Sequence, residues 1–401
     1  MNKILTGEKT YLMSVLVTHA HNRLAYCVTR CLAKHGIRVT CASDFPLAAC
    51  FFSRYCTDHF TYPSPWKHPD QFVQKIIDEI EKRDIEVLMP VHHEGFILAK
   101  YKDTLDRHVL FPYPAYSKID AVSDKARLIE IAAKAGVRIP KTITPRAIDQ
   151  LEEAKSSLRF PVRIKLRRGH GGIGMSLVKE ESDLIPAYQK TLHKFNISLQ
   201  EEYPIIQEHI EGKEMYVGML FNHGKLKAKF GHFKIRTYPA GHGSGTLSIQ
   251  LEDPRATKTL HKLAKSLNWH GIISGSIIIE ENTGTPYIID INPRFWGPLF
   301  LAIISGVEFP YLLYQMAKSG DIKPASQYTK GLQARWLHGD LASLPGYIQR
   351  KDWNQTLGIL TCRAPTDSWE SHDPIPFFTL PIYNLIQLIR IGTMQPLIEK
   401  Y

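Results

Sequence analysis

Residues 288–297 read IIDINPRFWG, an apolar strand that ends on a carboxylate, an amide and a guanidinium. Because a buried carboxylate without a partner is costly, Asp290 needs a cation nearby. Alternation along a strand places Asp290 and Asn292 on one face and the neighbouring isoleucines on the other. Two oxygen donors at this spacing suit Mg²⁺, and Arg294 adds a cation fit for phosphate or carboxylate. Taken alone, the stretch is explained equally well as a polar strand end with an Asn-Pro turn.

Two lysines beside a glycine-rich stretch have the chemistry of a phosphate site. Lys165 ends a predicted strand immediately before RRGHGGIGMS (167–176), and Lys125 opens a predicted helix. Glycines let backbone N–H groups surround phosphate oxygens, while lysines supply positive charge. The glycines expected to do so are Gly171, Gly172 and Gly174.

The stretch IIQEHIEGKEMYVGML (205–220) carries two carboxylates, Glu208 and Glu214, on either side of a glycine turn. The backbone of such a strand edge could hydrogen-bond an adenine, and a carboxylate could hydrogen-bond the ribose hydroxyls. Phosphate, nucleotide and metal ligands therefore occur in one order along the chain.

The secondary-structure elements that must position these residues follow two different patterns along the chain. In the first third, predicted strands at 13–19, 37–43 and 85–91 alternate with helices at 22–36 and 70–83. This alternation predicts a parallel, Rossmann-like sheet. THAHNR follows the first strand in place of G-x-G-x-x-G, so a dinucleotide site is not expected.

From about residue 117 the pattern changes to α+β with a mostly antiparallel sheet. FPYPAY (111–116), with two prolines, reads as the linker into this part, and residues 271–292 read as a hairpin turning at Asn282 to Gly284. The other elements predicted here are helices at 124–136 and 254–268 and strands at 161–166, 203–210, 214–222 and 225–238.

The fold class predicted is therefore α/β and α+β, in three parts. These are a Rossmann-like domain at 1–115, a second domain at 116–320, and a segment of helices and loops at 321–401 that packs on the second domain. The last residues, 374–401, are interpreted as a docking or subunit-contact segment, as in a homodimer. Their prolines and sparse basic face argue against a membrane-surface helix.

Composition bounds the classes of protein. The 401 residues are 44% hydrophobic and 22% charged, typical of a globular protein, and no stretch is long and apolar enough to predict a membrane span. Five of the six cysteines lie within the first 56 residues without a C-x-x-C pair, which suits a reducing compartment and the cytoplasm. The net charge is +11, but the basic residues are spread along the chain, so a nucleic-acid partner is not expected.

In this order, the motifs resemble those of the ATP-grasp superfamily, and within it predicted carboxylate-amine ligases similar to D-aspartate ligase and the carbamoyl-phosphate synthase large chain. SDKARLIEIAAKAGVRIPKT resembles the family's opening D-K…G-x-x-x-P, and RRGHGGIGMS its flexible phosphate-covering loop. IIQEHIEGKE resembles its hinge, and IIDINPRFWG its metal-binding E-x-N-P-R-x-x-G strand. The resemblance covers residues 13 to about 320 and implies a pre-ATP-grasp domain followed by an ATP-grasp fold.

The resemblance implies a nucleotide role for five residues. Lys125 and Lys165 would bind the α- and β-phosphates of ATP. Glu208 would lie at the adenine hinge with Ile210 beside it. Glu214 would hold the ribose.

It also implies the residues that act at the reacting end. Asp290 and Asn292 would bind Mg²⁺, or Mn²⁺ in its place, and Arg294 would steady the reacting phosphoryl or acyl phosphate. Lys234 and Arg236 alternate onto one strand face and resemble the family's cation pair near the γ-phosphate or the acid substrate. An exposed strand face explains these two equally well.

One departure from the family pattern concerns the metal. The family usually carries another carboxylate on the preceding strand, and here that position falls on Ser276 or Ile277. Either Glu280, nearer the turn, or water would complete the shell, or metal binding is weakened.

Histidines follow two of the predicted parallel strands. His19 and His21 follow the first, and His92, His93 and Glu94 follow a later one, all at carboxyl ends where open α/β sheets bind ligands. We expect the second group to line the acid or amine pocket. A zinc site is not predicted, since nothing in the sequence fixes a third or fourth ligand.

Together these observations predict an enzyme, an ATP-dependent ligase that joins a small carboxylic acid to an amine or amino acid through an acyl phosphate. The alternatives are an ATP-dependent carboxylase resembling carbamoyl-phosphate synthase, and a nucleotide-binding module without ligase turnover, to which the missing carboxylate at Ser276 points.

Overall fold

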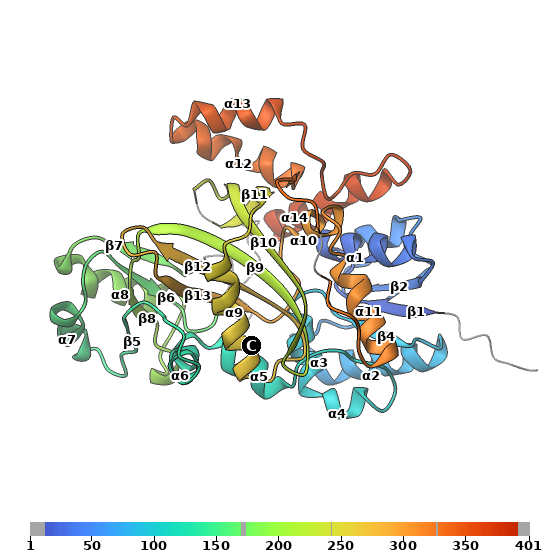
Figure 1. Ribbon diagram of the computed structural model, residues 1–401, viewed down its shortest axis with the longest axis horizontal. Coiled ribbons are helices and arrows are strands. Elements are labelled where there is room, and N and C mark those ends of the chain that lie inside the picture. Colours follow the sequence, from blue (N-terminus) through green and yellow to red (C-terminus); the bar gives the residue numbers. More distant parts are fainter. Residues whose placement is uncertain (1–12, 170–173, 242, 326–327, 392–401) are drawn as a thin grey trace, which may run out of the picture.

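The computed structural model describes residues 13–169, 174–241, 243–325 and 328–391. Figure 1 shows the described chain as three sheets with their helices. The blue N-terminal sheet lies at one side, a long antiparallel sheet crosses the middle, and a small sheet lies at the opposite side. Within these ranges no helix is both long and apolar enough to cross a membrane.

The N-terminal sheet is parallel throughout, in the order β3-β2-β1-β4. Its strands are β1 (Ser14–Val17), β2 (Arg38–Ser43), β3 (Asp58–Thr61) and β4 (Val87–Met89). Its helices are α1 (Arg23–Lys34), η1 (Ala49–Phe52), α2 (Pro69–Lys82), α3 (Glu94–Lys100) and α4 (Lys102–Leu105). The predicted Rossmann-like alternation is present, and the strand that the sequence pattern missed is β3, whose residues DHFT are mostly exposed.

Local sequence explains where α1 begins and ends. The side chain of Asn22 accepts a hydrogen bond from the backbone N–H of Leu24, which caps the first turn. Beyond the last turn, Gly36 has φ +74°, a conformation that glycine adopts without strain.

The small sheet has the order β5-β8-β6-β7, and its strand pairs are antiparallel. Two short helices lead to it, α5 (Tyr116–Ser123) and α6 (Lys125–Lys134). Its strands are β5 (Thr142–Ile143), β6 (Val162–Lys165), β7 (Ser176–Val178) and β8 (Ile205–Glu208). The accompanying helices are α7 (Gln150–Ser157), η2 (Glu181–Asp183), α8 (Leu184–Lys194) and η3 (Gln200–Glu202).

The central sheet is antiparallel in the order β13-β12-β9-β10-β11-β14. Its strands are β9 (Gly212–Asn222), β10 (Lys225–Tyr238), β11 (Ser244–Gln250), β12 (Gly271–Glu280), β13 (Pro286–Asn292) and β14 (Gln333–Arg335). The helix α9 (Pro254–Ser266) crosses it in Figure 1 and packs on β9, β10, β12 and β13. The predicted hairpin at 271–292 is therefore formed by β12 and β13.

One apolar cluster joins the N-terminal sheet to the central sheet. It contains residues of β1, β2, β4 and α1, residues of α10 (Leu299–Ile304) and α11 (Phe309–Ser319), and Phe230 and Ile272 of the central sheet. Because this core is shared and fully buried, the carboxyl ends of the parallel strands are held at a fixed position relative to β13.

The C-terminal helices are α12 (Leu337–Gln349), α13 (Trp353–Thr361) and α14 (Ile375–Ile391). The expectation that this segment packs on the second domain describes only part of its contacts. Helix α12 packs on β10 and β11, but α14 packs on η1 of the N-terminal unit. The last part of the predicted contact segment, residues 392–401, lies outside the described residues.

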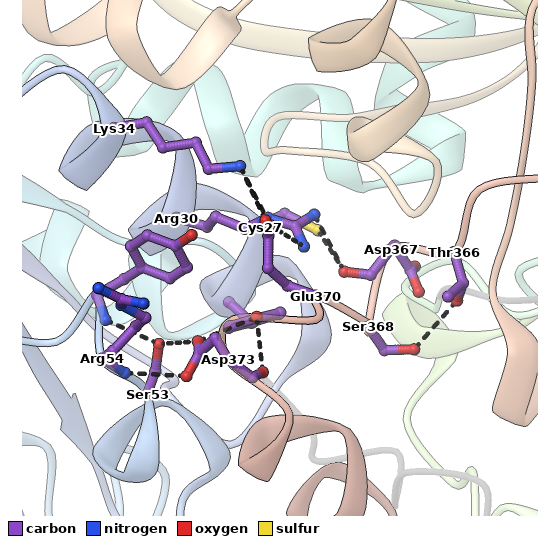
Figure 2. A network of polar contacts seen from close by, with 12 residues as sticks. Cys27, Arg30, Lys34, Ser53, Arg54, Thr366, Asp367, Ser368, Glu370 and Asp373 are labelled. Carbon is purple, nitrogen blue, oxygen red and sulfur yellow. Dashed lines mark hydrogen bonds and ion pairs between the residues drawn. The ribbon is translucent and has the colours of Figure 1, made fainter.

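A polar network ties the segment before α14 to the N-terminal unit (Figure 2). Glu370 pairs with Lys34 at 3.1 Å and with Arg30 at 3.4 Å. The carboxylate of Asp373 accepts hydrogen bonds from the Ser53 hydroxyl at 2.5 Å and from a backbone N–H at 3.0 Å. Carboxylates with several partners, of which Asp373 is buried, fix the path of this otherwise irregular segment.

Candidate active site

A cluster of charged side chains forms where the small sheet faces the central sheet. Lys125 stands at the first position of α6, Lys165 ends β6, and Glu214, Lys234 and Asp290 come from β9, β10 and β13. Lys125 Nζ lies 3.6 Å from a carboxylate oxygen of Asp290. The charges of Glu214 and Asp290 act on the pKa values of both Lys165 and Lys234, so the five groups share one site.

Lys165 is the most deeply buried of these cations, at 6% exposure. Its ammonium donates to the side-chain oxygen of Gln207 on the neighbouring strand β8, at 2.6 Å. Burial, and then the charge of Lys125, lower the pKa of Lys165 from 10.5 to about 8, although Asp290 and Glu214 oppose the shift. Desolvation therefore outweighs two nearby carboxylates.

Lys234 is in a similar position on the central sheet. Its ammonium donates to the backbone carbonyl of Gly243 at 3.1 Å and lies 3.7 Å from the centre of the Tyr216 ring. Burial lowers the pKa of Lys234 to about 8, against the raising effect of Glu214 and Asp290. Both lysines thus have neutral hydrogen-bond acceptors rather than a directly bonded carboxylate.

The strand β13 ends on the polar run from which the metal site was predicted. The side-chain amide of Asn292 donates to Asp290 at 3.3 Å, and Arg294 donates to the Asn292 side-chain oxygen at 3.4 Å. The predicted alternation holds, because the two oxygen-bearing side chains lie side by side. Carboxylate and amide oxygens so placed fit Mg²⁺ that takes its remaining ligands from phosphate and water.

The hairpin register explains the departure from the family pattern. Ser276 lies directly opposite Asp290, so a hydroxyl occupies the position where the resemblance leads one to expect a carboxylate. Glu280 lies four residues further along β12, about 13 Å away at the usual rise of a strand. Its carboxylate accepts a hydrogen bond from Thr283 in the turn. Including Glu280 among the metal ligands with Asp290 was therefore wrong.

Arg236 is also separated from the cluster, contrary to the pairing predicted with Lys234. A bulge interrupts the β10–β11 register between the two residues, and this breaks the alternation that would put them on one face. The guanidinium of Arg236 makes hydrogen bonds of 2.8 and 2.6 Å to the buried carboxylate of Asp340 on α12. Its observed role is to hold α12 against the central sheet.

The predicted hinge lies at the end of β8. Glu208 is buried, and its carboxylate accepts a hydrogen bond from the backbone N–H of Arg159 and pairs with the Arg159 guanidinium at 3.2 Å. Its own backbone N–H donates to the carbonyl of Lys141. Glu208 thus holds the end of β8 in place, and Ile210, two residues further on, is buried.

The predicted phosphate loop is described only in part. Gly171 and Gly172 lie outside the described residues. Gly174 has φ +70°, and a Cβ there would lie 2.4 Å from the Leu166 side chain, so glycine is required on both counts. At the start of the loop, Lys125 donates to the carbonyl of Gly169 at 3.1 Å.

Two residues that sequence reasoning missed belong to the cluster. Tyr216 forms the aromatic face beneath Lys234, and Gln207 accepts the hydrogen bond of Lys165. Strand alternation offered a signal for Tyr216, which lies two residues beyond Glu214 on β9. For Gln207 the sequence carried no signal, because its role depends on which strand pairs with β6.

Arg294 lies where the N-terminal unit borders the site. It shares a cavity of about 10 Å³ with Pro90 and Tyr113. Burial raises the pKa of Tyr113, and Glu94 raises it further while Arg294 opposes this. The charges of Arg294 and of Glu94, which belongs to the group predicted to line the substrate pocket, thus both act on the pKa of Tyr113. His93 of that group is buried, 4% exposed, with its ring against Phe96.

The fold and this cluster define a class of protein, and comparisons with solved structures support it. A biotin carboxylase in complex with β-γ-ATP from Campylobacter jejuni has a TM-score of 0.65 at 18% identity, over 80% of this chain and 74% of that one. An L-amino acid ligase from Bacillus licheniformis has a TM-score of 0.60 at 16% identity, over 78% and 77%. The fold is that of the ATP-grasp enzymes.

Family models agree. Residues 124–217 match the carbamoyl-phosphate synthase L chain, ATP binding domain, and residues 200–339 match "ATP-grasp in the biosynthetic pathway with Ter operon". The two matches together span residues 124–339, and they place this part of the chain among the ATP-grasp families. Among curated relatives, pyruvate carboxylase of Pichia angusta is 27% identical over 236 residues, which are 54% of this chain and 20% of that protein. The chain spans about a fifth of the length of such relatives.

Proposed function

We propose that this chain is an ATP-dependent ligase that joins a small carboxylic acid to an amine or amino acid through an acyl phosphate. The observation that carries the proposal is the pair of desolvated lysines, Lys165 and Lys234. A buried ammonium that is hydrogen-bonded only to neutral acceptors is costly, and an anionic ligand between the two would relieve that cost. The phosphates of a nucleotide are such a ligand.

Each residue of the cluster then has a task. Lys125 and Lys165 would bind the inner phosphates, and Lys234, on the opposite sheet, would bind the transferring end. Glu214, between them, would accept hydrogen bonds from the ribose hydroxyls. Ile210 would contact the adenine through its backbone. Arg294, at the border with the N-terminal unit, would orient the acid that receives the phosphoryl group.

The chemistry follows from this placement. A carboxylate oxygen attacks the γ-phosphorus of ATP, the bond to the β–γ bridging oxygen breaks, and ADP leaves. The amine then attacks the acyl carbon and displaces inorganic phosphate. Cations fixed around the phosphoryl group stabilise the charge of the first step without having to reorganise.

Asp290 and Asn292 would hold the Mg²⁺ of the nucleotide, or Mn²⁺ in its place, which neutralises phosphate charge when bound. Lys125 pairs with Asp290 at 3.6 Å and would turn toward phosphate when the nucleotide enters. Ser276 contributes only a hydroxyl to this face, so most of the metal shell would come from phosphate and water.

A carboxylase acting on bicarbonate is the second candidate, favoured by the likeness to biotin carboxylase. It would use the same lysines for phosphoryl transfer, but bicarbonate would accept the phosphoryl group in place of a carboxylic acid.

The test is an ADP-release screen of the purified chain with ATP and Mg²⁺ over pairs of carboxylic acids and amines, with bicarbonate as a separate arm. Release that needs both an acid and an amine supports the ligase. Release that needs bicarbonate and no other acid identifies the carboxylase. Calorimetric titration with ATP covers the third alternative: tight ATP binding without release in any arm would contradict the proposed ligase and leave a nucleotide-binding module.

We also propose that α14 is a subunit contact of a homodimer. Its apolar side chains Phe378 and Leu385 are 65% and 55% exposed. Sedimentation velocity of the wild type and Phe378→Ser would test this, and a monomeric wild type at micromolar concentration would contradict it.

A further inference from the structure

Away from the nucleotide cluster, the carboxyl ends of β1 and β4 bring together two histidines and a glutamate. His19 follows β1, and His92 and Glu94 follow β4. One ligand atom from each of these three side chains lies within 4.8 Å of the other two. The sequence showed the pair from β4, but the third member comes from a different strand, 73 residues earlier, and only the parallel sheet places it there.

Glu94 is held so that one of its oxygens points into this group. Oε1 accepts three hydrogen bonds, from the Thr18 hydroxyl at 2.7 Å and from the backbone N–H groups of Val91 at 3.0 Å and His92 at 3.3 Å. Oε2 is buried and accepts no hydrogen bond within the described part of the chain. His19 Nδ1 lies 3.7 Å from Oε2, beyond hydrogen-bonding distance.

His19 is equally constrained. Its φ of +59° is uncommon for a residue other than glycine, and its backbone N–H donates to the Tyr62 hydroxyl at 3.1 Å. Its ring is parallel to that of His92, with 4.9 Å between the ring centres. The side chain is 18% exposed, so an ion could reach it from solvent. Backbone strain of this kind persists where surrounding contacts over-determine the position.

A buried carboxylate oxygen that accepts no hydrogen bond among the described residues and lies beside two imidazoles has the composition of a metal site. A buried carboxylate oxygen without a hydrogen bond is costly, and a bound cation would relieve that cost. The nitrogen ligands select the kind of ion, because imidazole suits zinc and its neighbours, whereas all-oxygen sets such as Asp290 and Asn292 suit Mg²⁺.

We propose that His19, His92 and Glu94 bind a divalent transition-metal ion of the zinc class. Three protein ligands leave at least one coordination position for water or for a donor group of a small molecule, as in open zinc sites. The hydrogen bonds from Thr18 and the two backbone N–H groups would orient the carboxylate as a second shell. This site is independent of the proposed nucleotide site and needs no ATP.

The test uses the full chain, stripped with a chelator and free of nucleotide. Co²⁺, whose visible absorption reports low coordination number, is titrated in, and Zn²⁺ affinity is measured by competition. We expect one Co²⁺ per chain with a visible band, and a rise in melting temperature with Zn²⁺. His92→Ala, and His19→Asn, which tolerates positive φ, should each weaken binding by roughly tenfold or more.

Two variants serve as matched controls. His108→Asn removes a surface histidine that pairs with Glu81 at 2.8 Å, and Asp290→Asn removes the negative charge of the proposed Mg²⁺ site. Both should keep the Co²⁺ spectrum, so failure of this proposal and failure of the proposed function are distinguishable.

The proposal is overturned if His92→Ala and His19→Asn bind Co²⁺ as the wild type does, or if the wild type binds none. Should both variants unfold, X-ray absorption of the Zn²⁺-loaded wild type decides. Two imidazole nitrogens in the shell support the site, and an all-oxygen shell refutes it.

Discussion

Replacing Lys165 by methionine should weaken nucleotide binding strongly and yet leave the protein as stable as before, or more so. Methionine keeps the length of the apolar stem and removes the ammonium. Lys165 is 6% exposed and hydrogen-bonds only the amide oxygen of Gln207 among the described residues, so its charge is poorly solvated.

The magnitude follows from the pKa. A fall from 10.5 to about 8 corresponds to a cost of about 3 kcal/mol for holding the charged form in the fold. Because the folded pKa is the lower one, this cost is fully present at pH 7 and disappears as pH rises from about 8 toward 10.5. Methionine removes the cost but leaves the Gln207 oxygen without its donor, a loss of about 1–3 kcal/mol. The net change is a gain of about 0–2 kcal/mol.

Urea unfolding at pH 7 measures the free energy of unfolding, and calorimetric titration measures ATP affinity. We expect Lys165→Met to weaken ATP binding by roughly a hundredfold, since a charged hydrogen bond to phosphate is lost. Lys179→Met is the matched control, because Lys179 is exposed and should change neither quantity. A Lys165→Met protein with wild-type ATP affinity, or one destabilised by well over 2 kcal/mol, would refute the reasoning.

Four further outcomes are expected. Asp290→Asn should fold normally but lose Mg²⁺-dependent ADP release by roughly a hundredfold or more; near wild-type release beside an unchanged melting curve would contradict the metal assignment. Glu214→Ala should weaken ATP more than a 2',3'-dideoxy analogue, and equal losses would remove Glu214 from the ribose site. ATP affinity should fall as pH rises through about 8, because Lys165 and Lys234 lose their charges there. Calorimetry at pH 8 in buffers of different ionisation enthalpy should show that the protein takes up protons when ATP binds. No proton uptake would argue against contact between these lysines and phosphate. Arg236→Met should destabilise by about 2–3 kcal/mol, because the buried Asp340 carboxylate loses two charged hydrogen bonds while Arg335 still pairs with it at 3.5 Å, and it should leave ATP affinity of the folded protein intact; weaker ATP binding would restore Arg236 to the site.

Local patterns in the sequence predicted much of the fold. The helix at 22–36 was predicted from the pattern of the residues themselves, and the hairpin at 271–292 from its turn residues. The Asp290 and Asn292 pair followed from strand alternation alone. These features depend only on residues near one another in the chain, so sequence spacing carries them.

Alternation failed where the ladder is irregular. The bulge in β10 turns Arg236 away from the face of Lys234, and nothing in the run HFKIRTY distinguishes a bulged strand from a regular one. The place of Glu280 likewise depended on the exact register of β12 against β13, which sets Ser276 opposite Asp290. Register is a property of two strands and their turn together.

The sequence by itself thus determined the order of the motifs, the types of side chain available and their local faces. Only the tertiary structure decided which of those side chains are desolvated and which meet across strands. Lys165 is a buried cation bonded to Gln207 because β6 pairs with β8, and His19 meets Glu94 because β1 pairs with β4. Burial and long-range proximity are set by the packing of the whole chain, and no short stretch of sequence contains them.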